Sequence, residues 1–169
     1  MTVTLRAAGP NDLEHLRWAL YTAVTWDPAR PVPPYAVTID HPQLAIYHRG
    51  WRREGDLGLI AEGEGRVVGV ALCRVFTDGE HGHGYVDPGT PEIAVAVAEG
   101  HRGAGLGARL LEALAGEARR AGFRRLSLSV DRENPARRLY ERSGYRAISD
   151  DESGVRMVLD LQVEEPGSA

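Results

Sequence analysis

Residues 102–107 read RGAGLG, so that three glycines alternate with other residues directly after an arginine. Glycine has no side chain to hold a ligand away from the backbone, and the first N–H groups of a helix have no partner within that helix. Such a turn can bind phosphate at a helix N-terminus. The alternative is structural, in which the glycines only allow a tight connection between a strand and a helix.

The segments on either side of this loop have the patterns that the phosphate-binding interpretation requires. Before it, Ile93, Val95 and Val97 alternate with alanines, which predicts a buried strand. After it, apolar residues recur at helical spacing as Leu106, Leu110, Leu111, Leu114, Ala115 and Ala118. Residues 123–130 then alternate apolar and polar side chains. They predict a second strand, parallel to the first, which completes a right-handed βαβ unit.

A second segment follows at residues 134–145, which read NPARRLYERSGY. With the glycine loop it resembles two segments of the GCN5-related N-acetyltransferases, the GNAT family. The first matches that family's pyrophosphate loop, R/Q-x-x-G-x-G/A, and the second lies at about the expected distance downstream. The order of predicted elements is also similar over nearly the whole chain. The resemblance implies an α/β (α+β) fold: a mixed, mostly antiparallel sheet with one central parallel pair, splayed and flanked by helices.

The resemblance also implies which residues would bind acetyl-CoA. Backbone groups of Val95 and Val97 would contact the pantetheine arm between the two splayed strands, and Asn134 would bind the same arm. The pyrophosphate would lie against a continuous run of the loop and first helical turn, namely Arg102, Gly103, Ala104, Gly105, Leu106, Gly107 and Ala108.

Acyl transfer to an amine requires the ammonium to lose a proton and the departing thiolate to gain one. Tyr140 matches the family's tyrosine that faces the thioester sulfur, which makes it the predicted proton donor. Glu92 matches a position where many family members carry a carboxylate base. The structural alternatives are an aromatic ring packed under the sheet for Tyr140 and a solvated glutamate at a strand end for Glu92.

A dinucleotide-binding interpretation competes with this one, because residues 103–108 also fit G-x-G-x-x-G/A and Asp131 follows the next strand. Four residues, 99–102, separate the strand from the first glycine, and Asp131 follows that glycine by 28 residues rather than about 20. Too little chain follows to complete a doubly wound sheet. A non-catalytic acyl-CoA-binding protein on the GNAT-like fold is the other alternative.

The remaining elements are predicted from periodicity and turn residues. We expect strands at 2–7, 57–62 and 66–76, a helix that follows an N-cap at Asp12 and fades near Trp26-Asp27-Pro28, and a final hairpin at 145–148 and 155–161. Residues 27–35 contain four prolines and predict a loop. A helix is expected to start at Asp40-His41-Pro42 and to carry its apolar side as far as Trp51.

The acceptor side is less well specified by the sequence. The resemblance places five aromatic residues near the acceptor cleft: Trp26, Tyr35, Tyr47, Trp51 and Tyr85. His81 and His83 lie in a glycine-rich loop, 77–90, that we expect to border the substrate rather than bind a metal, since no nearby ligands complete a metal site. His48 is expected to be a packed or solvated residue.

Composition limits the remaining possibilities. The chain has 169 residues and 43% hydrophobic residues, which predicts one domain at 1–162 followed by a tail at 163–169. A net charge of −4 gives no general electrostatic reason to bind nucleic acid, and no run approaches a membrane span. We expect a cytoplasmic enzyme, a possible homodimer, that uses acetyl-CoA and no metal on a small-molecule or peptide amine. Cys73, the single cysteine, is expected to be a buried core thiol.

Overall fold

The computed structural model describes residues 2–162 and forms one seven-stranded sheet with helices on both faces. The strand order is β1-β2-β3-β4-β5-β7-β6, and every neighbouring pair is antiparallel except β4 with β5. The strands are β1 (Val3–Ala7), β2 (Leu57–Gly63), β3 (Arg66–Arg74), β4 (Glu92–Val97), β5 (Arg125–Val130), β6 (Arg146–Asp151) and β7 (Gly154–Asp160). The helices are α1 (Leu13–Val24), α2 (Tyr35–Ile39), α3 (Pro42–Ala45), α4 (Leu106–Arg120) and α5 (Ala136–Arg142), with 3-10 turns at Pro10–Asp12 and Glu99–His101.

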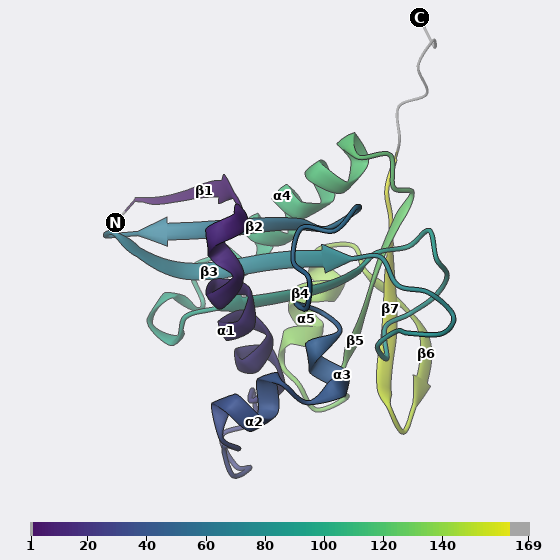
Figure 1. Ribbon diagram of the computed structural model, residues 1–169, viewed down its shortest axis with the longest axis horizontal. Coiled ribbons are helices and arrows are strands. Elements are labelled where there is room, and N and C mark those ends of the chain that lie inside the picture. Colours follow the sequence, from purple (N-terminus) through teal and green to yellow (C-terminus); the bar gives the residue numbers. More distant parts are fainter. Residues whose placement is uncertain (1, 163–169) are drawn as a thin grey trace, which may run out of the picture.

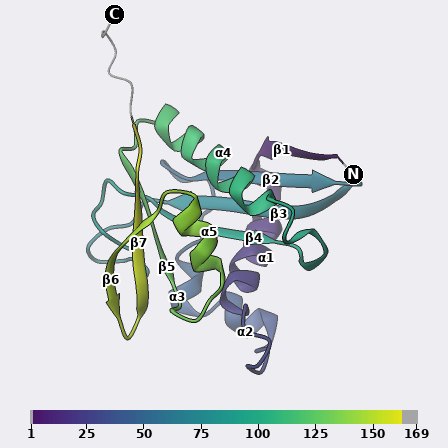
Figure 2. The same cartoon turned by 180° about the vertical axis from the view of Figure 1, so that it is seen from behind.

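The sheet separates two hydrophobic cores, one on each face. Figures 1 and 2, seen from opposite sides, show α1 and α4 on opposite faces of the sheet. On one face α1 buries Leu16, Ala19 and Leu20 against alternate residues of β2, β3 and β4. On the other face α4 buries its predicted leucine and alanine stripe against the remaining residues of these strands and against β5 and β7. The period of two sends alternate side chains of each strand to opposite cores, and the period of 3.6 gives each helix one buried side.

The central parallel pair is splayed. Within the described residues, the ladder of β4 with β5 consists of the pair Glu92 with Ser127, together with a 2.9 Å bond from the Ser127 N–H to the Pro91 carbonyl. Beyond this point β4 continues beside β3 alone, while β5 continues beside β7. Figure 1 shows β5 turning away from β4 toward β7 and β6. The fold class expected from the resemblance is therefore confirmed.

Most element bounds differ from the sequence predictions by one to three residues, but the region between α1 and β2 needed correction. The helix expected to run from Pro42 to Trp51 is only Pro42–Ala45, and turns replace its second half. A short helix at Tyr35–Ile39 was not predicted. Pro34 is its N-cap residue, a place where the missing proline N–H costs no helical hydrogen bond, so the prolines end where the helix begins.

None of the helices described for residues 2–162 is long and apolar enough to cross a membrane. Cys73 is fully buried in the core, and burial raises the pKa of its thiol to about 12, as a core thiol requires. The predicted tail at 163–169 lies outside the described residues.

Candidate active site

The edge of β4 that faces β5 carries backbone groups that no strand meets. The Ala98 N–H donates to the Val68 carbonyl at 2.8 Å, in a register that pairs Gly69 with Val97. Residues that bond to a given partner strand alternate along an antiparallel ladder. The N–H and C=O groups of Val95 and Val97 therefore point away from β3, into the gap beside β5. A chain-like polar ligand could bond to them there as a further strand would.

The glycine loop lies at the end of this gap and leads directly into α4. Gly103 and Gly105 have φ angles of 78° and 82°, a left-handed conformation that glycine adopts without strain. Gly105 is the N-cap residue of α4, so the unpaired N–H groups of the first turn lie next to it. The Nε of Arg102 donates to the Val97 carbonyl at 3.0 Å, which ties the loop to the end of β4.

Gly107 differs from the other two glycines of the loop. A Cβ atom at this position would lie 2.8 Å from Cδ2 of Leu139, whereas a Cβ at Gly103 or Gly105 would meet no atom within 4 Å. Gly107 thus allows α5, which carries Leu139 and Tyr140, to pack closely against the start of α4. Of the three glycines, two serve the turn and one serves helix packing.

A cleft of about 1200 Å3 joins the gap, the glycine loop and the ends of α1 and α5. Its lining includes every residue predicted for acetyl-CoA binding or catalysis except Ala104, which is exposed on the loop. The predicted residues that line it are Glu92, Val95, Val97, Arg102, Gly103, Gly105, Leu106, Gly107, Ala108, Asn134 and Tyr140. Segments more than 40 residues apart in the sequence thus share one cleft.

The family model for the acetyltransferase (GNAT) family matches residues 12–145 of this chain. The chain belongs to this family. The matched residues run from the start of α1 to the end of the second motif, and so include every predicted site residue. Among curated proteins the sequence comparison found no match.

Solved structures resemble this GNAT protein over their whole length. A putative acetyltransferase from Salmonella typhimurium, yncA, solved with its cofactor acetyl-CoA, has a TM-score of 0.71 at 24% identity and covers 100% of this chain and 99% of its own. A PaiA N-acetyltransferase from Thermoplasma acidophilum, in complex with coenzyme A, has a TM-score of 0.67 at 16% identity over 95% and 99%. A ribosomal-protein-alanine N-acetyltransferase from Brucella melitensis has a TM-score of 0.66 at 27% identity over 94% and 99%.

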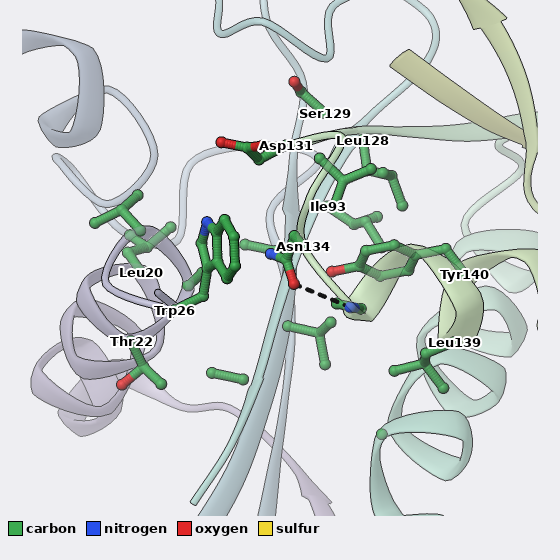
Figure 3. A pocket seen from close by; sticks show the side chains of 18 of the residues that line it. Leu20, Thr22, Trp26, Ile93, Leu128, Ser129, Asp131, Asn134, Leu139 and Tyr140 are labelled. Atoms are coloured by element: carbon green, nitrogen blue, oxygen red, sulfur yellow. Dashed lines mark hydrogen bonds between the residues drawn. The ribbon is translucent and has the colours of Figure 1, made fainter. Parts of the chain in front are cut away.

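In this GNAT protein Tyr140 and Asn134 face the cleft from the α5 side (Figure 3). The Oδ1 of Asn134 accepts the Ala136 N–H at 2.9 Å, which supports the first turn of α5 and leaves the amide NH2 group for a ligand. Tyr140 packs edge-on against Tyr145 with 6.0 Å between ring centroids. Burial raises the pKa of Tyr140 to about 12, so the phenol keeps its proton at neutral pH.

Glu92 approaches from the opposite face. Ile93 belongs to the core under α4 and Ala94 packs in the core under α1, so alternation places the Glu92 side chain on the α1 face. The residue is only 3% exposed, and its Oε1 accepts hydrogen bonds from the Tyr47 hydroxyl and, at 3.1 Å, from the Gly84 N–H. Burial raises the pKa of this carboxyl, while the two hydrogen bonds act in the opposite direction.

We call the part of the cleft near α1, the turns after α3 and Glu92 its acceptor end, because the resemblance places the acceptor there. It contains only part of the predicted aromatic set. Trp26 and Tyr47 line it, and Figure 3 shows Trp26 across from Tyr140. The other three are engaged elsewhere: Trp51 donates its indole N–H to the Gly9 carbonyl at 3.0 Å, Tyr35 stacks edge-on with Tyr21, and Tyr85 bonds to Asp78. These three are not among the residues that line the cleft.

His81 and His83 line the cleft, as does His41, so the loop at 77–90 borders the cleft. No group of three or more possible metal ligands occurs among residues 2–162. His48 is a packed residue: its Nε2 lies 2.9 Å from the Ile39 carbonyl, and burial lowers its pKa.

Sequence reasoning missed the groups that hold Glu92. It gave Tyr47 no partner, and it assigned no role to Gly82 and Gly84 beyond membership of a polar loop. Their spacing of two residues, in the loop that leads to the central strand, is the signal that could have drawn attention to them.

Proposed function

We propose that this protein is an acetyl-CoA-dependent N-acetyltransferase that acetylates a primary amine of a small molecule or peptide, with residues 1–162 as one catalytic domain. The observation that carries the proposal is the edge of β4 at Val95 and Val97, which no strand of residues 2–162 pairs with and which ends at the glycine loop, where Arg102 bonds to the Val97 carbonyl, and at the N-terminus of α4. A gap with peptide groups along one side and free helical N–H groups at its end fits a pantetheine arm followed by a pyrophosphate.

The chain's own residues suit each part of this ligand. The Arg102–Ala108 turn would hold the pyrophosphate with backbone N–H groups, without steric hindrance from a Cβ at 103 or 105. Backbone groups of β4 and the free amide of Asn134 would hold the arm. When bound, acetyl-CoA supplies an acetyl thioester that an amine can attack.

Proton transfer is assigned to two groups on opposite faces of the sheet. Glu92, on the α1 face, accepts the proton that the ammonium must lose before it can act as a nucleophile. Tyr140, on the α5 face, donates its phenolic proton to the departing sulfur, and the proton that the nitrogen loses as the amide forms returns to the Tyr140 oxygen. A backbone N–H near Val97 is placed to polarise the thioester carbonyl.

Several features support transfer to an amine. Two of the structural neighbours are named N-acetyltransferases. The cleft also contains a buried carboxylate, Glu92, which could attract a cationic acceptor. A homodimer and a cytoplasmic location stay predictions.

A thiol-release assay tests the proposal. Purified protein is mixed with acetyl-CoA and a panel of amino acids, polyamines, aminoglycosides and N-terminal peptides, and free CoA is measured against reactions that lack acceptor. Acceptor-dependent release with a matching mass increase on the amine is the expected result. Thermal shift with CoA and with NAD runs in parallel: stabilisation by CoA without turnover indicates the non-catalytic alternative, and stabilisation by NAD alone contradicts the family-based proposal.

A further inference from the structure

The loop before β4 covers Glu92 with two glycines that its conformation does not require. Neither Gly82 nor Gly84 has a positive φ angle, so other residues could adopt this backbone. A Cβ at Gly82, however, would lie 1.7 Å from the Tyr47 hydroxyl oxygen and 2.9 Å from Oε2 of Glu92. A Cβ at Gly84 would lie 2.7 Å from Oε1 of Glu92. The contacts, and not the backbone angles, exclude side chains here.

The two oxygens of Glu92 have different environments. Oε1 accepts both hydrogen bonds, from the Tyr47 hydroxyl and the Gly84 N–H. Oε2 is buried and has no hydrogen-bond partner among the described residues. A buried carboxylate oxygen without a partner is costly unless a ligand or a proton completes it.

The covering loop is bonded to the sheet at one point and is braced by a contact within itself. The His83 carbonyl accepts a 3.1 Å bond from Nε of Arg156 on β7, and His81 stacks on Tyr85 with 4.2 Å between the ring centroids. Tyr47 is fixed in turn by an edge-on contact with Phe76, at 5.1 Å between centroids. The Tyr47 phenol and the backbone of residues 82–84 are therefore held beside Glu92 by other contacts.

We propose that Tyr47 is a positioning residue for Glu92, which acts together with the backbone of Gly82 and Gly84 to hold Oε1 and to leave Oε2 as the oxygen that takes the proton of the acceptor ammonium. This inference rests on the proposed function, in which Glu92 is the base. The proton moves from the ammonium nitrogen to Oε2, which leaves a neutral amine and a neutral carboxylic acid. Tyr47 keeps its own proton throughout.

The charged and titratable groups around Glu92 define what else could move its titration. They are Tyr47 after α3, His81 on the covering loop, Arg156 on β7 and Arg74, the cross-strand neighbour on β3. The guanidinium of Arg74 is bound to Asp56 and to two backbone carbonyls. Removal of the Tyr47 hydroxyl changes one of these groups and leaves the others in place.

The test measures the titration of Glu92 directly, so that it needs no acceptor. Protein with 13C-labelled glutamate carboxyl groups is titrated by NMR, and the Glu92 signal is assigned by its loss in Glu92→Gln. Tyr47→Phe removes a hydrogen bond that favours the charged carboxyl, so its midpoint should shift to higher pH. The Tm of the variant checks that the protein remains folded.

Gly82→Ala provides the second arm, with Gly79→Ala as its matched control in the same loop, since a Cβ at Gly79 meets nothing within 4 Å. Gly82→Ala should shift the midpoint in the same direction as Tyr47→Phe, because its methyl group would displace the Tyr47 hydroxyl and lie against Oε2 of Glu92. Gly79→Ala should leave it unchanged. Where an acceptor has been found, the acid limb of kcat/KM should move with the midpoint.

An unchanged Glu92 midpoint in folded Tyr47→Phe overturns the inference, whatever the activity. A shifted midpoint in a protein that transfers no acetyl group to any acceptor contradicts the proposed function and leaves the positioning of Oε1 by Tyr47 intact. An unchanged midpoint in folded Gly82→Ala, equal to that of Gly79→Ala, would overturn the role of the covering loop.

Discussion

The two ends of the cleft are lined by different chemical groups, backbone at one end and side chains at the other. At the cofactor end, the main groups are backbone N–H and C=O groups of β4, the glycine loop and the first turn of α4, all between residues 92 and 108. At the acceptor end, side chains meet from α1, the turns after α3, the loop before β4 and β4 itself. The difference teaches that a site for a ligand common to a family can be formed by the backbone of one contiguous segment. The shape of the acceptor end depends instead on how distant segments pack.

The variant with the largest expected effect on activity is Tyr140→Phe, which tests whether proton transfer can be lost while cofactor binding is kept. The variant keeps the ring and its contact with Tyr145 but loses the phenolic proton, so kcat should fall by about 100- to 10,000-fold. The Kd for CoA should not change, because the hydroxyl contributes to proton transfer and not to the backbone cradle. Steady-state kinetics and calorimetry measure the two quantities. Wild-type kcat would return Tyr140 to a packing role.

The second prediction breaks the support of the acceptor end. Arg74 and Asp56 form a buried ion pair, with side chains 1% and 0% exposed, and Arg74 also binds the carbonyls of Ile46 and Arg49, on either side of Tyr47. Asp56→Asn leaves a buried cation without its partner and should reduce the free energy of unfolding by about 3–5 kcal/mol. Urea unfolding measures the loss.

The control for that variant is Glu62→Gln, which removes one of the two carboxylate partners of Arg6, in a pair whose side chains are 42% and 40% exposed. We expect at most about 1 kcal/mol there, because solvent screens exposed pairs. Folded Asp56→Asn should still bind CoA with wild-type affinity. A parallel loss of CoA affinity would show that the two ends of the cleft are not independent.

The third prediction concerns the cofactor end alone. Ala108 is exposed in the first turn of α4, where an acidic residue interacts favourably with the helix dipole. Ala108→Glu should therefore keep or raise Tm, while repulsion between its carboxylate and a pyrophosphate should weaken CoA binding by roughly tenfold to 100-fold. Ala108→Gln has nearly the same size without the charge and should bind more tightly than Ala108→Glu. Equal affinities would argue against a pyrophosphate at this turn.

The smallest expected effect comes from Gly107→Ala. The new methyl group would displace Leu139 and with it α5, so kcat should fall several-fold while CoA affinity changes little. Gly116→Ala lies in the same helix, and a Cβ there meets only the flexible end of Arg120, at 3.5 Å. It should stabilise the protein by about 0.5–1 kcal/mol and leave activity unchanged. If CoA affinity fell with Gly107→Ala, this glycine would have a ligand-binding role as well.

The sequence by itself determined those parts whose chemistry is local. Periodicity and two short motifs predicted the order of strands and helices, the parallel pair and the glycine loop. This was possible because backbone conformation and helix ends are set by residues close in the chain. The short helix at Tyr35–Ile39 and the early end of α3 could not be predicted in this way, because packing on α1 and β4 decides them in a segment rich in prolines.

Only the tertiary structure decided how Glu92 is held. Tyr47 and Glu92 lie 45 residues apart, and no spacing within either segment indicates that the phenol bonds to the carboxyl. The same holds for Gly82 and Gly84, where contacts and not φ angles exclude a side chain. It also holds for Gly107, where the lack of a side chain leaves room for Leu139. A side chain's partners depend on the packing of the whole chain, whereas a loop's backbone geometry depends on its own residues.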